Sequence, residues 1–149
     1  MKLISKKYIW KKPLTYRNMA VVDTLVIHHS ASANNLTADD IHKEHINKGW
    51  SGIGYHFVIT PDGTVYTGRP VNAVGANVEN QNSHIIGICL IGNFDVGSNK
   101  PTKQQLQALR ELLAYLEKIK HFKKVCGHRD LMATACPGKN FSLAEFRRG

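Results

Sequence analysis

Apolar positions follow two different spacings along the chain, and the spacings alternate from one segment to the next. Short, nearly continuous apolar runs at residues 25–27 and 85–91 are typical of buried strands, which pack on both faces. Residues 55–60 and 64–67 are also strand-like, and the sequence PDG at 61–63 between them has turn chemistry. We therefore expect these two segments to form a hairpin.

Helical spacing appears in two longer segments. Residues 38–48 follow Thr37, a good N-cap, and stop at a glycine, which predicts a first helix. Residues 103 to about 120 carry apolar side chains at helical spacing and polar ones elsewhere, which predicts the longest helix. Its apolar face consists of Leu106, Leu109, Leu112, Leu113, Leu116 and Ile119.

The remaining elements complete an alternating order. Residues 125–126 predict a short strand, and residues 141–146 predict a last helical turn. The order strand, helix, hairpin, strand, helix, strand predicts an α/β fold with a central mixed β-sheet flanked by α-helices. A chain of 149 residues, 42% of them apolar, fits one compact core, so we expect residues 1–149 to form a single domain.

The charge balance narrows the classes of partner. A formal net charge of +9 predicts attraction to an anionic polymer such as nucleic acid, anionic lipid or a bacterial wall polymer. No segment approaches the ~18 apolar residues of a membrane span. The basic start of the chain is not followed by the apolar core of a signal peptide, so we expect a protein made in the cytoplasm.

Histidine and cysteine positions indicate where the chemistry lies. Three cysteines argue against a disulfide framework, and Cys89 and Cys126 lie in strand-like segments where a thiol acts as a small hydrophobe. His28 follows the first strand, His128 follows the last one, and Cys136 lies eight positions further on. Two imidazoles and a thiolate at strand ends suit a tetrahedral zinc with one position left for water. The spacing alone leaves open that these are satisfied polar groups and a packed thiol.

Several sequence blocks resemble, in order, the type 2 N-acetylmuramoyl-L-alanine amidases, a family that includes phage endolysins and animal peptidoglycan recognition proteins. The resemblance covers roughly residues 25–138. Its blocks are VIHHSA at 26–31, GWSGIGYHF at 49–57, DGTVYTGR at 62–69, NSHIIGI at 82–88, GHRD at 127–130 and TACPG at 134–138.

The resemblance implies roles for individual residues. The zinc ligands would be His28, His128 and Cys136, and His29 should point to the opposite face of its strand. Tyr55 matches the catalytic tyrosine, whose hydroxyl would orient the zinc water or hydrogen-bond the oxyanion. Thr134 matches a catalytic position as well, where its hydroxyl can donate one hydrogen bond to the developing oxyanion.

Substrate recognition is expected from two asparagines that follow the hairpin. Asn77 stands where many relatives carry a histidine facing the substrate cleft, and Asn82 opens the fourth block. Asn77 can still hydrogen-bond, although it cannot titrate. Among the other polar residues, we expect His42 and His45 to be structural or exposed, and we leave open whether Asp130 orients a zinc histidine or caps a turn.

The resemblance implies a zinc-dependent enzyme that cleaves peptidoglycan between N-acetylmuramic acid and L-alanine. With no signal peptide, the expectation is a monomeric phage or prophage endolysin that binds muropeptides and anionic wall polymers, made in the host cytoplasm and reaching the wall at lysis. The alternatives are a non-catalytic peptidoglycan receptor and a phage regulator on the same fold. Specific nucleic-acid binding is not expected, because no nucleic-acid motif is present.

Overall fold

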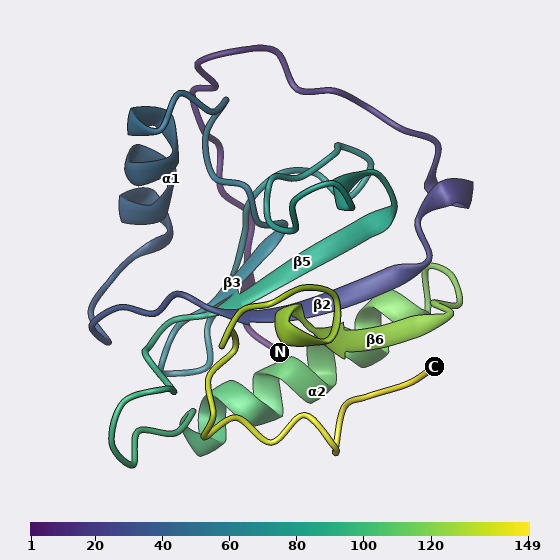
Figure 1. Cartoon of the computed structure of the whole chain (residues 1–149). Coiled ribbons are helices and arrows are strands. Elements are labelled where there is room, and N and C mark those ends of the chain that lie inside the picture. Colours follow the sequence, from purple (N-terminus) through teal and green to yellow (C-terminus); the bar gives the residue numbers. More distant parts are fainter.

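A six-stranded mixed sheet forms the centre of the computed structural model, which describes all 149 residues (Figure 1). The spatial order of the strands is β1-β4-β3-β5-β2-β6. The hairpin of β3 and β4 is antiparallel, whereas all other neighbours pair in parallel, so the predicted mixed α/β sheet is confirmed. The strands are β1 (Leu3–Ile4), β2 (Thr24–His29), β3 (Phe57–Ile59), β4 (Val65–Thr67), β5 (Ile85–Leu90) and β6 (Lys124–Gly127).

Two α-helices, α1 (Ala38–Asn47) and α2 (Lys103–Glu117), begin at threonine caps. Thr37 accepts the backbone N–H of Asp40 at 3.1 Å, and the Asp40 carboxylate accepts that of Thr37 at 2.9 Å. Such a capping box satisfies N–H groups that have no partner inside the helix. A matching box at Thr102 starts α2, which ends at Glu117, before the expected residue 120. The short 3-10 helices are η1 (Met19–Val21), η2 (Asn82–His84) and η3 (His128–Asp130).

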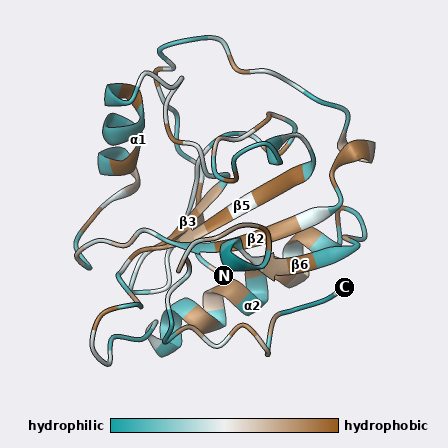
Figure 2. Cartoon of the chain, in the orientation of Figure 1, coloured by the Kyte–Doolittle hydropathy of each residue, from teal (hydrophilic) through white to brown (hydrophobic).

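The two faces of the sheet carry different partners. Ile86, Ile88 and Leu90 of β5 pack in the main core with the apolar face of α2. Cys89, on the opposite face of β5, packs with Ile41 of α1. The helices therefore cover opposite sides of the sheet (Figure 1). Both faces of β5 are covered, which is why it is hydrophobic along its length whereas α2 carries hydrophilic residues on its outer side (Figure 2).

The alternation of side chains along β2 decides which histidine can reach the site. Leu25 and Ile27 face the core beneath α2, and His29 follows them on that face, where its Nδ1 accepts the N–H of Phe94 at 3.1 Å. Val26 and His28 lie on the opposite face. Both histidines belong to β2 itself, whereas the sequence placed them just after a shorter strand.

The C-terminal segment contains a single turn where the sequence predicts a last helical turn. Residues 141–146 form no regular helix, but the backbone N–H groups of Phe146 and Arg147 donate to Leu143 O at 2.8 and 3.0 Å. The buried side chains of Phe141, Leu143 and Phe146 pack in the main core. Arg148 then pairs with Val125 of β6 in an isolated antiparallel bridge. No helix in the structure has the length and apolar character that a membrane crossing requires.

Candidate metal centre

Three side chains from two distant parts of the sequence meet at one edge of the sheet. His28 lies near the end of β2, and His128 begins η3, directly after the neighbouring parallel strand β6. Cys136 comes from the loop that follows η3. The potential ligand atoms of these three residues all lie within 4.8 Å of one another. The Nδ1 of His28 is 3.6 Å from the Sγ of Cys136.

The three side chains offer the nitrogen and sulfur ligands that a zinc ion prefers. His128 Nε2 is buried and has no hydrogen-bond partner, a state that costs about 1–3 kcal/mol unless something else binds the nitrogen. Burial lowers the pKa of His28 to about 3 and also lowers that of His128, so both rings are neutral at pH 7. Burial raises the pKa of the Cys136 thiol to about 11, and a bound cation would reverse that effect. Two neutral imidazoles and a thiol that a cation deprotonates are typical zinc ligands.

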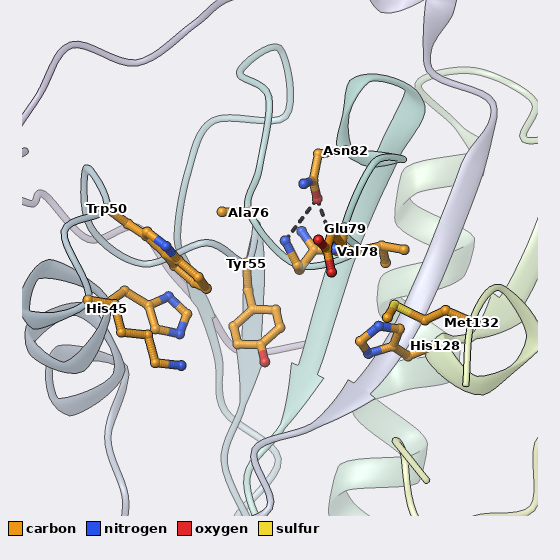
Figure 3. Close-up of a pocket in the computed structure, with 11 residues that line it drawn as sticks. His45, Trp50, Tyr55, Ala76, Val78, Glu79, Asn82, His128 and Met132 are labelled. Carbon is orange, nitrogen blue, oxygen red and sulfur yellow. Dashed lines mark hydrogen bonds between the residues drawn. The ribbon is translucent and has the colours of Figure 1, made fainter. Parts of the chain in front are cut away.

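Two cavities meet beside these ligands. One is a groove of about 590 Å³, shown in Figure 3, and the other is a smaller cavity of about 430 Å³. Tyr55 and His128 line both of them, while His28, Thr134 and Cys136 line the smaller one. The cluster of His28, His128 and Cys136 therefore lies where the groove and the smaller cavity meet.

Tyr55 lies beside the cluster, and its catalytic role stays a prediction. Its ring centroid is 5.1 Å from that of His28, and Figure 3 shows the side chain between Trp50 and His128. Burial raises the pKa of Tyr55 well above its usual value, and the nearby thiols of Cys89 and Cys136 raise it further. The phenol is therefore a hydrogen-bond donor at neutral pH.

Thr134 lies in the loop that carries Cys136. Its Oγ1 accepts the backbone N–H of Cys136 at 3.3 Å, so the hydroxyl hydrogen is free to point elsewhere. Because Thr134 also lines the smaller cavity, that hydrogen can be donated to a group bound there.

The two asparagines expected to bind substrate line the groove, but their side chains also hold the site together. Asn77 Oδ1 is 3.1 Å from His28 Nε2, and Asn77 Nδ2 donates to Gly54 O at 3.0 Å. Asn82 Oδ1 accepts the backbone N–H groups of Asn77 and Val78 at 2.8 and 2.9 Å, as the dashed lines in Figure 3 show. Their role in substrate binding stays a prediction.

The groove is also lined by residues to which the sequence gave no role in binding. His45 and Trp50 stack edge to face at 4.6 Å, and the ammonium group of Lys48 lies 5.0 Å from the Trp50 ring centre. Met132 lies across the groove beside His128 (Figure 3). The sequence feature that could have indicated this part of the groove is Trp50, an aromatic residue in a glycine-rich loop. The Trp50 side chain remains 37% exposed.

Other polar residues considered from the sequence have structural contacts. His42 Nδ1 accepts the N–H of Ile53 at 3.0 Å, and His45 Nδ1 accepts that of Gly54 at 2.8 Å, although His45 also lines the groove. Asp130 accepts the N–H of Gly127 at 2.9 Å and pairs with an arginine, so it caps a turn.

Sequence comparison agrees with this geometry. The profile of the N-acetylmuramoyl-L-alanine amidases matches residues 17–139. The chain belongs to this family. The amidase is 38% identical to the endolysin of Klebsiella phage KP32 over 122 residues, which cover 77% of this chain and 81% of the endolysin. It is thus a peptidoglycan hydrolase related to phage endolysins.

Solved structures support the same assignment. N-acetylmuramoyl-L-alanine amidase LysC from Clostridium intestinale URNW superposes with a TM-score of 0.90 at 39% identity, covering 97% of this chain and 94% of LysC. A mutant of the Drosophila recognition protein PGRP-LB, in complex with tracheal cytotoxin, superposes with a TM-score of 0.80 at 29% identity. That match covers 93% of this chain and 89% of the recognition protein.

Proposed function

We propose that this amidase holds a zinc ion on His28, His128 and Cys136 and hydrolyses the amide bond between N-acetylmuramic acid and L-alanine. The observation that carries the proposal is the cluster itself, in which a buried, unpartnered His128 Nε2 lies beside a second neutral histidine and a thiol. A zinc ion bound there would polarise an amide carbonyl and lower the pKa of a water molecule.

The chain's own residues then position the reacting groups. Tyr55, protonated and next to the cluster, donates a hydrogen bond to the oxygen on which negative charge develops. Thr134 can donate to the same oxygen from the smaller cavity. No Asp or Glu belongs to the cluster, although Glu79 lines the groove and Asp95 lines the smaller cavity. Tyr55, whose ring lies against His28, is the side chain that we expect to handle a proton.

The two cavities account for the size of the proposed substrate. A muropeptide has a sugar part and a peptide part, joined at the bond to be cut, and the cluster lies at the junction of two cavities. The Trp50 ring offers an apolar face in the groove, and Lys48 offers a cation for a carboxylate of the stem peptide. The complex of the related PGRP-LB with tracheal cytotoxin supports binding of such a ligand to this fold.

The biological setting follows from the relatives and the charge. We infer that the protein is an endolysin whose domain acts as a monomer, made in the host cytoplasm and acting on the wall after release at lysis. The similarity to the KP32 endolysin supports this setting. The net charge of +9 favours adhesion to anionic wall polymers.

The test is digestion of purified peptidoglycan, with the new chain ends identified by mass spectrometry. We expect free stem peptides that begin with L-alanine, lost when a chelator removes the metal and restored when zinc is added. Intact stem peptides in the presence of a zinc-loaded protein would refute the proposal and favour the receptor alternative. New reducing sugar ends would instead show cleavage of the glycan strand.

A matched pair of variants makes the same assay specific to the cluster. Cys136→Ser replaces a proposed ligand, whereas Cys126→Ser replaces a thiol that is 2% exposed and lies outside the cluster. We expect cleavage to be lost in the first variant and kept in the second. Equal loss in both would mean that the effect comes from general destabilisation.

A further inference from the structure

The side chain of Asn77 lies between a backbone carbonyl and a proposed metal ligand. Its Nδ2 is 3.0 Å from Gly54 O, and its Oδ1 is 3.1 Å from His28 Nε2. The expectation from sequence was a contact with substrate.

The direction of these hydrogen bonds follows from the carbonyl. Gly54 O can only accept, and it already accepts the N–H of Ala76 at 3.0 Å. The group of Asn77 that faces this oxygen must therefore be the NH₂ end of the amide, and the end facing His28 must be the carbonyl Oδ1. An amide oxygen can only accept, so the His28 nitrogen opposite it, Nε2, must carry the hydrogen.

The other nitrogen of His28 is thereby left with a free lone pair. A neutral imidazole has one N–H, and once this lies on Nε2 the Nδ1 atom is an acceptor or a metal ligand. Nδ1 is the atom that lies 3.6 Å from Cys136 Sγ, within the cluster. The chain of contacts from Gly54 O to His28 therefore selects the nitrogen that faces the metal.

The Asn77 side chain packs against two glycines, Gly75 and Gly87, which have no side chain to displace it. A Cβ atom at Gly87 would lie 2.5 Å from the amide of Asn77, and one at Gly75 would lie 2.7 Å from its Nδ2. Real Cβ atoms do not approach other atoms so closely, so both positions must lack a side chain if Asn77 is to stay where it is. Its backbone N–H is fixed as well, by Asn82 Oδ1 at 2.8 Å.

We propose that Asn77 is a positioning residue that fixes His28 in the Nε2–H tautomer and so presents Nδ1 to the metal. The proposal rests on the metal centre proposed above and adds to it a residue that touches neither metal nor reacting atoms. Hydrogen-bond partners of metal-binding histidines typically contribute a factor of about 10–100 in metal affinity.

The direct test is the tautomer of His28 in the metal-free protein at neutral pH. Long-range proton–nitrogen NMR spectra of ¹⁵N-labelled protein report which ring nitrogen carries the hydrogen, and a His28→Gln variant assigns the signals. We expect wild-type His28 to be protonated on Nε2. A hydrogen on Nδ1 would overturn the proposal, and this measurement needs no variant of Asn77.

Variants then test whether Asn77 is the cause. Asn77→Ala removes the acceptor, so we expect a mixed or inverted tautomer and an affinity for zinc that falls about 10–100-fold in a chelator competition. Asn77→Asp keeps an acceptor beside His28 Nε2 but sets an oxygen in place of the NH₂ group that donates to Gly54 O, so we expect the Nε2–H tautomer in a less stable protein. Asn140→Ala is the control, because it removes an asparagine side chain that donates to Gly97 O in an exposed loop.

Two results separate this proposal from the proposed function. An Asn77→Ala protein with the wild-type tautomer and the wild-type zinc affinity would overturn the role of Asn77, whatever the protein cleaves. A wild-type protein with His28 protonated on Nε2 that binds zinc but leaves muropeptides intact would support this role and refute the amidase reaction.

Discussion

Arg69 offers the sharpest prediction about what holds the site together. Its side chain is almost fully buried, and its guanidinium donates to Ile53 O at 2.8 Å, Val74 O at 3.0 Å and Gly52 O at 3.2 Å. No carboxylate lies within ion-pair distance of it. This cation therefore joins the loop before Tyr55 to the loop before Asn77.

The magnitude follows from the three hydrogen bonds. Each bond to a charged donor is worth about 1.5–3 kcal/mol, and the cost of burying the cation offsets part of the sum. Removing the guanidinium leaves three neutral buried carbonyls without a donor, at about 1–3 kcal/mol each, but it also removes the cost of burying the cation, so we expect a net loss of about 3–5 kcal/mol. Arg69→Met, which keeps the aliphatic bulk, should lower the free energy of unfolding by that amount. With a urea slope of about 2 kcal/mol per molar, the midpoint falls by about 1.5–2.5 M.

The assay is urea unfolding of metal-free protein followed by tryptophan fluorescence. Arg110→Met is the matched control, because Arg110 forms an exposed ion pair with Glu145, and its midpoint should stay at the wild-type value. A shift of less than about 0.5 M for Arg69→Met would show that the three buried carbonyls do not depend on the guanidinium for the stability of the fold. Repeating the measurement with zinc shows how far the metal compensates for the loss.

Three further predictions concern the ligands, the tyrosine and acid. Cys136→Ala should lose zinc binding in a chelator competition, whereas Cys126→Ala should keep it; equal affinities would remove Cys136 from the metal centre. Tyr55→Phe should lower kcat with little change in zinc affinity, and full turnover would exclude a role for the hydroxyl. Burial lowers the pKa of His28 and of His56 to about 3. Below pH ~6.5 the unfolded chain therefore binds more protons, and each ring costs about 1.4 kcal/mol of stability per pH unit as pH falls toward 3. Urea midpoints measured at pH 7, 6 and 5 should fall with pH in the wild-type protein and fall less steeply with pH in His56→Gln. An equally steep fall in both proteins would contradict the prediction.

Local chemistry predicted the framework of the fold. The sequence predicts that the first helix begins after Thr37 and ends before Gly49. In the structure Thr37 forms a capping box, and Gly49 has a positive φ of 90°. The apolar run at 85–91 became the central strand, because only such a run can be buried on both faces. β1 was missed, since two residues carry no periodicity and pair only through contact with β4.

The candidate site was only partly readable from the sequence. His28 is far in the chain from His128 and Cys136, and the spacing left two interpretations open until the resemblance favoured one. The contact of Asn77 with His28 depends on the fold, because it requires β5 to bring a glycine against the Asn77 side chain. The carbonyls that accept hydrogen bonds from Arg69 belong to the backbone, so no pattern of side chains in the sequence could predict these contacts.

The most direct test of zinc-dependent amide cleavage is a titration of metal-free protein with zinc on a defined muropeptide. The measured quantity is the rate at which peptides with a free N-terminal L-alanine appear, set against the zinc bound per chain. We predict that the rate rises in proportion to bound zinc and levels off at one equivalent, with no response in Cys136→Ala. Full cleavage in the metal-free protein, or none with one zinc bound, would contradict the account.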